Sequence, residues 1–517
     1  MKKILLYLVL TLNIFEGKAQ PPMNRYTAAL FPNVTETTNV LFSTNVPQPV
    51  PGGGFYEGIT GYPLNVNEYE TTNVNLYMNI FRPTGDTLSK RPVAIICFGG
   101  GFITGSKDHW SIRLLAQELA KRGFVTAVID YRLGMNIFDE ALSMRAVYRG
   151  IQDGRSAVRF FKADAAGANI YKVDPDQIYI GGHSAGAFIA THNAYLNLES
   201  ERPASTYAWT QSCGFLGWYT CNCPNLGCLD CAGNNQSQSG HAKAVFSLAG
   251  ALGFTTYMQT ANDPIISMFH SQDDDTVPYN SGQPFGSVSG FIVGFDLPIV
   301  YGSLPMSQRA AFLGIPYQFN SYTNRGHSVH EETSSTLYPD IVPGISNWFF
   351  TKLLKPAAHT ISGKINVCSS ALTQTYTTQS GLAKYYHWEV TGGTLVNDNP
   401  RLNYVTVNWS NTATSRSLKL TPYSKWDGKG DQVTINVNVA DSFTNTWTAS
   451  TSGQWTETGK WSLAMVPEPC HHVAIPAQIS PVEVTLQSSQ TYQIKSLTLG
   501  NNAKLTVKQP GNLILQN

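Results

Sequence analysis

A serine flanked by glycines stands where this sequence passes from a short apolar run into an alanine-rich segment. The run Ile178 to Ile180 precedes the G-x-S-x-G pattern Gly182-His183-Ser184-Ala185-Gly186, which is typical of a strand, a sharp turn and a helix in succession. Such a turn exposes the serine hydroxyl, and Cβ atoms at the two glycines would collide with the neighbouring strand and helix. Because a chain with 44 glycines can match this pattern by chance, the prediction that Ser184 is a catalytic nucleophile needs partner residues elsewhere.

Acid and base side chains follow two later strand-like runs. The run Ile265 to Phe269 precedes His270 and the adjacent carboxylates Asp273 to Asp275. A later run precedes Gly326-His327, with His330 as an alternative base. A serine hydroxyl attacks efficiently only when an imidazole takes its proton and a carboxylate fixes that imidazole. The chain therefore offers a nucleophile, an acid and a base in that order.

A glycine-rich segment follows the apolar run Pro92 to Phe98. It consists of Gly99-Gly100-Gly101-Phe102, and glycines let the backbone approach a substrate oxygen closely. Preorganised N–H groups at a developing oxyanion each lower the barrier by about 3–4 kcal/mol. We predict that the N–H groups of Gly100, Gly101 and Ala185 form an oxyanion hole.

Strand-like and helix-like segments alternate between these motifs. Apolar residues have helical spacing over 109–122 and 140–165, on either side of a buried strand candidate at 125–131. This alternation predicts an α/β fold with a mostly parallel sheet and helices on both faces, where ligands bind at the carboxyl ends of the strands. Residues 62–70 and 74–82, separated by a polar turn, predict a hairpin.

Four motifs in register carry a family resemblance over residues 62–355. The glycine loop, the Ser184 turn, the segment His270 to Pro278 and Gly326-His327 resemble those of α/β-hydrolases of the carboxylesterase and hormone-sensitive-lipase-like group, close to bacterial feruloyl and acetylxylan esterases. The resemblance implies a secreted serine ester hydrolase that works through an acyl-enzyme without a cofactor or metal. Its substrate would be a small-molecule or polymer-borne ester.

The same resemblance assigns single residues. The family's acid lies four residues after the histidine of its pattern and falls on Asp274, although Asp273 remains an alternative, and the family's base falls on His327. Phe102 and His183 are expected to bind substrate. Phe98 stands where many relatives have a histidine that braces the glycine loop. A serine peptidase on the same fold, or an adhesion protein with a retired hydrolase body, remain the alternatives.

Composition limits the partners and the compartment. The 517 residues carry a formal charge of +1 and only 13% are charged, so nothing points to nucleic acid. Lys2-Lys3 before the apolar run Ile4 to Leu12 predicts a signal peptide over residues 1–20. No other stretch is long enough to span a bilayer. We expect a secreted protein, extracellular or at the cell surface, with the periplasm as a further possibility.

Five of the 8 cysteines gather between Cys213 and Cys231. In an oxidising compartment such a cluster predicts disulfides, and a zinc site is the alternative. Cys97, in an apolar strand, is expected to be a buried free thiol. The surrounding insertion, residues 199–243, carries aromatic side chains such as Trp209 and Trp218, which either shape the active-site mouth or pack on the body.

Composition changes near residue 357, so the hydrolase domain is expected over 21–357. Short alternating strands over 360–440 predict an antiparallel sandwich, whose sequence resembles the PKD-like immunoglobulin-fold modules of secreted Bacteroidetes proteins. Residues 443–517 predict a β-solenoid or a small sandwich, with tryptophans that could stack on sugars or form a core. These modules are expected to attach the enzyme to a polysaccharide or a cell surface.

Overall fold

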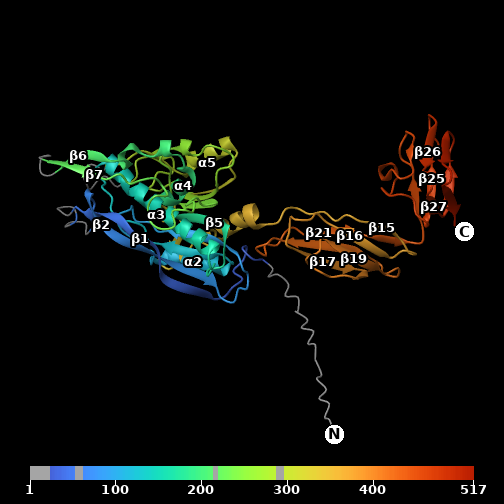
Figure 1. Cartoon of the computed structure of the whole chain (residues 1–517), viewed down its shortest axis with the longest axis horizontal. Helices are drawn as coiled ribbons and strands as arrows, with labels where there is room; N and C mark the ends of the chain where they lie inside the picture. The colour runs from blue at the N-terminus through green and yellow to red at the C-terminus, as the bar shows by residue number, and fades with distance from the viewer. Residues whose placement is uncertain (1–23, 53–56, 58–61, 214–218, 287–295, 517) are drawn as a thin grey trace, which may run out of the picture. The chain divides into compact units, whose positions relative to one another are not determined.

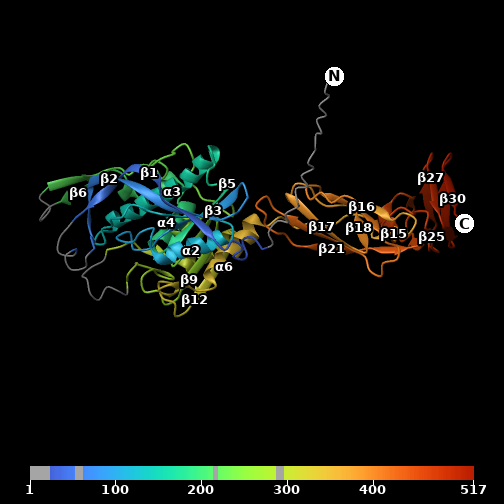
Figure 2. The same cartoon turned by 90° about the horizontal axis from the view of Figure 1, so that it is seen from below.

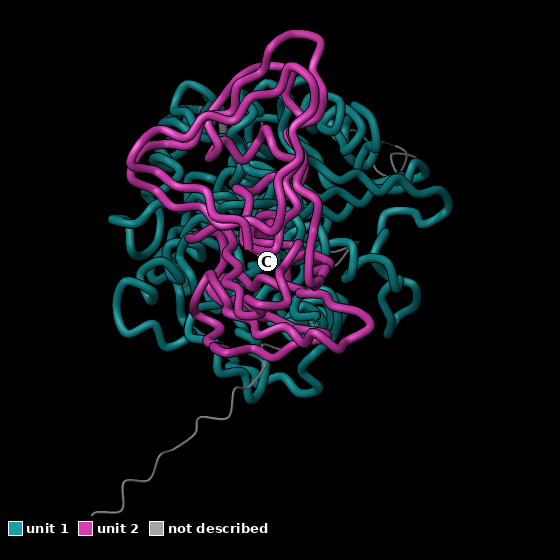
Figure 3. Tube along the Cα trace, turned by 90° about the vertical axis from the view of Figure 1, so that its right-hand side faces the viewer, with its two compact units in different colours: residues 1–354, 426–428 teal, residues 355–425, 429–517 magenta. Residues whose placement is uncertain are grey.

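The computed structural model describes residues 24–52, 57, 62–213, 219–286 and 296–516. The predicted signal peptide, residues 1–20, lies outside this range. The chain divides into two compact units, shown in Figure 3: unit 1 comprises residues 1–354 and 426–428, and unit 2 comprises residues 355–425 and 429–517.

The elements of unit 1 have the following bounds. Its strands are β1 (Val34–Pro51), β2 (Val66–Pro83), β3 (Arg91–Cys97), β4 (Val125–Ile129), β5 (Val173–His183), β6 (Trp209–Cys213), β7 (Tyr219–Cys223), β8 (Ala244–Leu248), β9 (Ile265–Ser271), β10 (Ser281–Gly282), β11 (Val300–Tyr301), β12 (Tyr317–Tyr322), β13 (Glu331–Thr333) and β14 (Thr336–Leu337). Its α-helices are α2 (Trp110–Lys121), α3 (Glu140–Ala166), α4 (Ala185–Tyr195), α5 (Ser303–Leu313) and α6 (Ile341–Phe349).

An eight-stranded sheet forms the centre of unit 1 (Figure 1), in the order β1-β2-β4-β3-β5-β8-β9-β12. β1 and β2 are antiparallel to their neighbours, and the six strands from β4 to β12 are parallel. Helices follow the parallel strands and cover the sheet. This is the α/β-hydrolase fold, as the sequence predicted, and it gathers the carboxyl ends of β3, β5, β9 and β12 along one edge.

Two successive residues of β5 show that both faces of the sheet are covered. The Tyr179 ring lies 4.5 Å from the Phe349 ring of α6, and a Cβ at Gly154 of α3 would lie 3.2 Å from Ile180. Because adjacent strand residues point to opposite faces, α6 and α3 lie on opposite sides. α2 packs beside α6, and α4 packs beside α3 (Figure 2).

The predicted hairpin at 62–70 and 74–82 is wrong. From Val66 onward both runs belong to one continuous strand, β2, which pairs along most of its length with β1 through four register shifts. The exposed residues between the runs remain in the strand because they stay in register with β1, Thr72 opposite Gln48 and Thr71 opposite Pro49. β1 itself comes from a segment whose prolines and polar residues gave no strand signal.

The insertion of residues 199–243 is fastened to α3. Arg145 donates to the carbonyls of Ser205 and Pro224 at 2.7 and 2.6 Å. The Tyr148 hydroxyl donates to the Gly227 carbonyl at 3.0 Å. These buried donors give the insertion a polar anchor on the body of the unit, which its few apolar residues could not provide.

The cysteines of this insertion form disulfides. Cys228 bonds to Cys231, Cys221 is also disulfide-bonded, and Cys223 is a buried free thiol. The disulfide prediction is therefore confirmed for three of the five residues, while the side chain of Cys213 lies outside those that the structure describes. Cys97 is a buried free thiol, as predicted.

The strands of unit 2 fall into two groups. The first group is β15 (Asn366–Cys368), β16 (Thr373–Thr377), β17 (Tyr385–Thr391), β18 (Gly393–Leu395), β19 (Tyr404–Trp409), β20 (Ser417–Tyr423), β21 (Val433–Asn436) and β22 (Asn438–Ala440). The second group is β23 (Phe443–Thr446), β24 (Gly453–Gln454), β25 (His471–Ile475), β26 (Val482–Leu486), β27 (Thr491–Ile494), β28 (Ser496–Leu499), β29 (Ala503–Val507) and β30 (Asn512–Leu515).

The first group is a sandwich around one apolar core. Its two three-stranded sheets, β16-β19-β18 and β17-β20-β21, are antiparallel. The inward residues Tyr376, Trp388 and Trp409 are buried in the core between them. Trp409 also donates from its indole nitrogen to the Tyr376 hydroxyl at 2.9 Å, so the one polar atom of this large side chain is satisfied.

The second group is a parallel coil, as in a β-solenoid. Each strand pairs in parallel with one from a later turn, for example Val473 with Leu497 and Val484 with Leu505. Trp447, Trp455 and Trp461 form its core and are at most 3% exposed. These tryptophans therefore hold the coil together, and they are not available as a platform for sugar rings.

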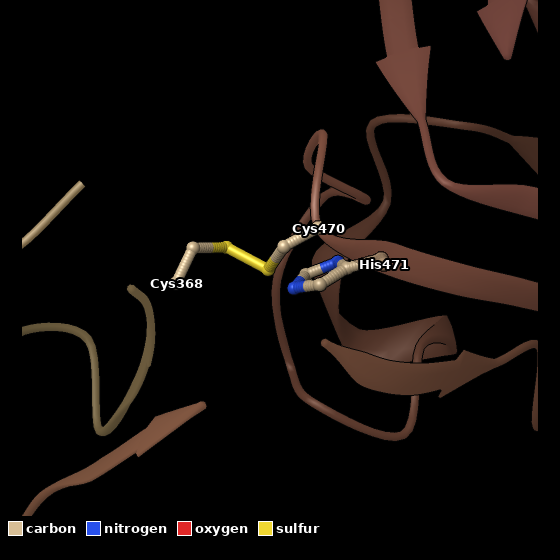
Figure 4. Close-up of side chains that lie close together, drawn as sticks. All are labelled: Cys368, Cys470 and His471. Atoms are coloured by element: carbon tan, nitrogen blue, oxygen red, sulfur yellow. A yellow bond between two sulfur atoms is a disulfide. The ribbon is translucent and has the colours of Figure 1, made fainter. Parts of the chain in front are cut away.

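A disulfide joins the two groups of strands. Cys368 of β15 bonds to Cys470, 102 residues later, and His471 lies beside the pair (Figure 4). The three side chains are close enough to resemble a metal site, but sulfurs bonded to each other are not thiolate ligands. No local sequence pattern points to this pairing, because the partner of Cys368 lies in the next group of strands.

Among the described residues, no helix combines the length and the apolar composition that a membrane crossing requires.

We predict that the double variant Cys368→Ser/Cys470→Ser destabilises unit 2. A cross-link that closes a loop of this length restricts the unfolded chain by roughly 3 kcal/mol more than one between residues three apart, such as Cys228 and Cys231. Differential scanning calorimetry of the full chain should show one transition lowered on the order of 10 °C. The matched variant Cys228→Ser/Cys231→Ser should shift its transition much less, and equal shifts would contradict the loop-length argument.

Candidate active site

Ser184 lies at a strained turn between β5 and α4. Its backbone has φ 54° and ψ −124°, a region that non-glycine residues rarely occupy. The turn can form because Cβ atoms at Gly182 and Gly186 would lie 2.4 and 2.1 Å from the carbonyl oxygen of Cys97, so only glycine fits at both positions. The hydroxyl is thus held at the carboxyl edge of the sheet, where β3 ends.

The glycine loop lies against this turn. Gly100 and Gly101 have φ of 131° and 61°, which favours glycine, and their N–H groups donate to no backbone carbonyl within the part of the chain that is described. Ala185 is the first residue of α4, where the N–H has no acceptor inside the helix. The three N–H groups predicted as an oxyanion hole therefore remain available for a substrate oxygen.

Tyr131 holds Phe98, the residue directly before the glycine loop. Its ring stacks on Phe98 at 4.2 Å, and its hydroxyl donates to the Phe98 carbonyl at 3.0 Å. Phe102 packs edge-on against the same tyrosine at 5.8 Å. Sequence reasoning missed the role of Tyr131, which it placed within the strand candidate 125–131, whereas β4 ends two residues earlier at Ile129.

Asp274 is a buried carboxylate that accepts several hydrogen bonds. Its side chain is fully buried, and Oδ1 accepts from the backbone N–H groups of Thr276 and Val277 at 2.9 Å each. Burial raises the pKa of Asp274, but hydrogen bonds from His270 and His327 and the Val277 N–H outweigh it and hold the pKa well below its usual value. The group therefore stays ionised.

His327 joins this carboxylate to the serine. Its Nδ1 lies 2.9 Å from Asp274 Oδ2 and its Nε2 lies 2.9 Å from Ser184 Oγ. Since Nδ1–H donates to the carboxylate, Nε2 presents a lone pair to the serine hydroxyl. Asp273 and Asp275 are exposed, and Asp273 instead accepts from Ser271, so the structure places Asp274 and neither neighbour at the imidazole.

The loop that carries His327 is fixed by Arg325. The guanidinium lies between the rings of Tyr322 and Tyr338, 3.6 and 3.8 Å from their centroids, and forms an ion pair with Asp340 at 3.1 Å. Gly326, with φ of 58°, makes the turn that follows. The sequence analysis identified Gly326 but not Arg325. The role of Arg325 depends on two tyrosines that are 16 residues apart in sequence and meet only in the folded chain.

Two further histidines, His183 and His330, lie beside the base. The His183 Nε2–H donates to the carbonyl of His327 at 3.0 Å, and His183 lies 4.6 Å from the ring of His330. Burial lowers the pKa of His183 well below its usual value, and the neighbouring imidazoles lower it further. The same two causes, burial first, lower the pKa of His330 to about 3. His330 is bonded to Ser111 at 3.1 Å, away from Ser184, so the alternative base is not in contact with the serine.

A cavity of about 540 Å³ opens onto Ser184 and His327. His183, predicted to bind substrate, lines it, whereas Phe102 lines a smaller cavity on the other side of Ser184. No described residue of the insertion 199–243 lines either cavity. Packing on the body is thus the observed role of that insertion's described part.

The arrangement can carry out nucleophilic acyl transfer. It brings together a hydroxyl, an imidazole that can take its proton, an ionised carboxylate behind the imidazole, and N–H donors beside the hydroxyl. The cavity gives a substrate access to this group of residues.

Comparisons with known proteins agree with this chemistry. A family model described as BD-FAE matches residues 78–287. The chain is 34% identical over 128 residues to the neuroligin-like protein glit-1 of Caenorhabditis elegans, covering 24% of this chain and 16% of that protein. It is 30% identical over 146 residues to gut esterase 1 of the same organism, covering 28% of this chain and 25% of that protein. The chain thus spans a quarter or less of the length of these two relatives.

Lipase 1 of Geotrichum candidum is 31% identical over 123 residues, covering 23% of this chain and 21% of the lipase. Among solved structures, esterase 2 of Thermogutta terrifontis is similar with a TM-score of 0.36 at 18% identity, covering 54% of this chain and 90% of that one. A truncated carbohydrate esterase from gut microbiota has a TM-score of 0.35 at 17% identity, covering 62% of this chain and 97% of that one.

Because the pKa of His330 is low, we predict that the folded protein loses stability in mild acid. The imidazole stays neutral in the folded protein down to about pH 3, whereas the unfolded chain binds a proton below about pH 6.5. The unfolded state therefore holds more protons, and stability falls as the pH drops from 6.5 towards 5, by about 1.4 kcal/mol per pH unit for each such histidine. His192, with its pKa lowered by burial to about 4, adds to the effect.

Urea unfolding at pH 7, 6 and 5 measures this slope. His330→Gln should reduce the loss of unfolding free energy by about 1.4 kcal/mol per pH unit, the contribution of one histidine. This change in slope is expected even if the variant is less stable at pH 7. An unchanged slope would mean that His330 is protonated in the folded protein.

Proposed function

We propose that the protein is a serine carboxylic-ester hydrolase that works through an acyl-enzyme, with Ser184, His327 and Asp274 as its catalytic triad. The observation that carries this proposal is the continuous hydrogen-bonded path from Ser184 Oγ through His327 to Asp274, with 2.9 Å at each of its two contacts. The path opens onto a cavity of about 540 Å³.

Acylation begins when Ser184 Oγ attacks the ester carbonyl carbon and its proton passes to His327 Nε2. The negative charge that develops on the carbonyl oxygen is stabilised by the N–H groups of Gly100, Gly101 and Ala185. Ionised Asp274 stabilises the imidazolium. When the intermediate collapses, the carbon–oxygen bond to the alcohol breaks and His327 returns the proton to the leaving alkoxide.

Deacylation repeats these steps with water. His327 Nε2 takes a proton from a water molecule that attacks the acyl carbon, and the same imidazole then protonates Ser184 Oγ as the carboxylic acid leaves. His183 and His330 are kept neutral by their low pKa values, so neither adds a positive charge beside the imidazolium.

The similarity to named esterases and a lipase favours an ester over an amide substrate. The matched family span, residues 78–287, contains the glycine loop, Ser184 and Asp274 but ends before His327. The base is therefore supported by the geometry of this chain and not by that match.

We further propose that the enzyme is secreted and that its C-terminal β modules, of PKD-like type in residues 360–440, attach it to a polysaccharide or a cell surface. The disulfides in both units support an oxidising compartment. Any sugar contact would use side chains other than Trp447, Trp455 and Trp461.

Ser184→Ala should lower the hydrolysis of p-nitrophenyl acetate by at least about 10⁴-fold, because the nucleophile is lost. A fluorophosphonate probe should label the wild type at Ser184, as located by mass spectrometry of the peptide. The matched variant Ser335→Ala, at an exposed serine of the same unit, should keep both properties. An inert wild type that the probe fails to label would falsify the enzyme proposal, and hydrolysis of peptide p-nitroanilides in preference to esters would favour a peptidase.

Asp274→Asn should reduce kcat about 10³–10⁴-fold, because an amide cannot stabilise the imidazolium and leaves the wrong tautomer at His327. Asp273→Asn and Asp275→Asn change the same charge at exposed neighbours and should reduce kcat less than about threefold, the small effect typical of exposed charges. A greater loss at Asp273 than at Asp274 would contradict the assignment.

A further inference from the structure

Two cavities meet at Ser184, and their walls differ. Besides the larger cavity with His327, a small cavity of about 50 Å³ lies on the other side of the serine. Ser184, Gly101 and Phe285 line both. Ala185 lines only the small cavity and His327 only the larger one. The serine hydroxyl therefore stands at the junction of two separate compartments.

The proposed reaction assigns one half of an ester to each compartment. The leaving alkoxide must receive its proton from His327 Nε2, so the alcohol part lies in the larger cavity. The carbonyl oxygen faces the N–H groups of Gly100, Gly101 and Ala185, and the last two of these residues line the small cavity. The acyl chain then extends into the small cavity, whose walls are almost entirely apolar, including Phe102, Met135 and Phe188.

The size of the small cavity limits the acyl chain. A space of 50 Å³ holds on the order of four water-sized groups, and a methylene is similar in size to a water molecule. Acyl groups of two to four carbons fit there, and longer ones reach its far wall.

A third cavity lies directly behind that wall. It has a volume of about 470 Å³ and is mostly apolar, with Met144, Ile151, Phe254 and Ile299 among its lining residues. The residues shared by the small and the third cavity form the partition between them: Val147, Phe188, Leu297, Pro298 and Val300.

We propose that this partition sets the acyl-chain length, and that Val147 of α3 and Leu297 are the residues that close the small cavity against the 470 Å³ chamber. This inference rests on the proposed ester hydrolysis. The wild type is then selective for esters of acids with two to four carbons. Shortening either side chain joins the two cavities and admits medium-length aliphatic acyl groups.

Val147→Ala opens the partition with the least disturbance to the fold. Val147 is only half-buried, and alanine is a better helix former than valine, so Val147→Ala is suited to the middle of α3. Leu297→Ala opens the same wall from the opposite loop. Ile299→Ala is the matched control, because Ile299 is 60% exposed and lines the third cavity but not the partition.

The experiment measures kcat/KM for p-nitrophenyl acetate, butyrate, hexanoate and octanoate with the full-length protein. In the wild type, kcat/KM should fall at least tenfold between butyrate and hexanoate. In Val147→Ala and Leu297→Ala, the ratio of octanoate to acetate should rise at least tenfold, since each methylene that enters an apolar chamber adds about fourfold. Ile299→Ala should leave the ratio unchanged, and Val147→Leu should reduce the ratio of butyrate to acetate.

Wild-type activity on octanoate equal to that on butyrate would overturn the proposal, as would an unchanged ratio in both opened variants. In either case the acetate activity persists, and only the acyl-length limit fails. If no variant hydrolyses any ester and Ser184 is not labelled by a phosphonate, the proposed function fails and takes this inference with it.

Discussion

The close approach of the Ser184 turn to the end of β3 is the constraint on which the rest of the site depends. Gly182 and Gly186 lie so near the Cys97 carbonyl that no other residue fits, and this contact forces Ser184 to a positive φ. The glycine loop begins two residues after Cys97, so the same contact that strains the serine also brings the N–H donors beside it. One backbone contact thus positions both the nucleophile and the groups that would stabilise its oxyanion.

The electrostatics of the site are arranged around this fixed serine. Asp274 is buried yet ionised, because its hydrogen bonds outweigh the cost of burial. Beside His327 the protein places two imidazoles whose pKa values are lowered, His183 and His330, while His270 lies 3.1 Å from the carboxylate itself. Among the described residues, His327 is the one histidine that contacts both the acid and the serine. A proton that leaves the serine would therefore reach the imidazole that faces the carboxylate.

Local patterns predicted the parts of the fold that depend on neighbours in sequence. The alternating elements, the Ser184 turn, the glycine loop and the acid and base after their strands all follow from such patterns. Features that depend on distant partners were missed or predicted wrongly. β1 is a strand because β2 pairs with it, and Tyr131 braces Phe98 across 33 residues. Cys470 lies in another module from Cys368. In each case the residue and its neighbours in sequence carry no distinctive pattern, and its role depends on a contact with a residue distant in sequence.

The helix α3 contacts both the insertion and the small cavity behind Ser184. Its buried arginines and Tyr148 hold the insertion by its backbone carbonyls, which keeps the described part of that segment on the body and away from Ser184. None of its described residues lines the two cavities at Ser184. One residue before Tyr148, Val147 of the same helix forms part of the wall behind the serine. Because helix residues at successive positions point in different directions, one rigid helix can fix the insertion with one side chain and limit the acyl cavity with the next.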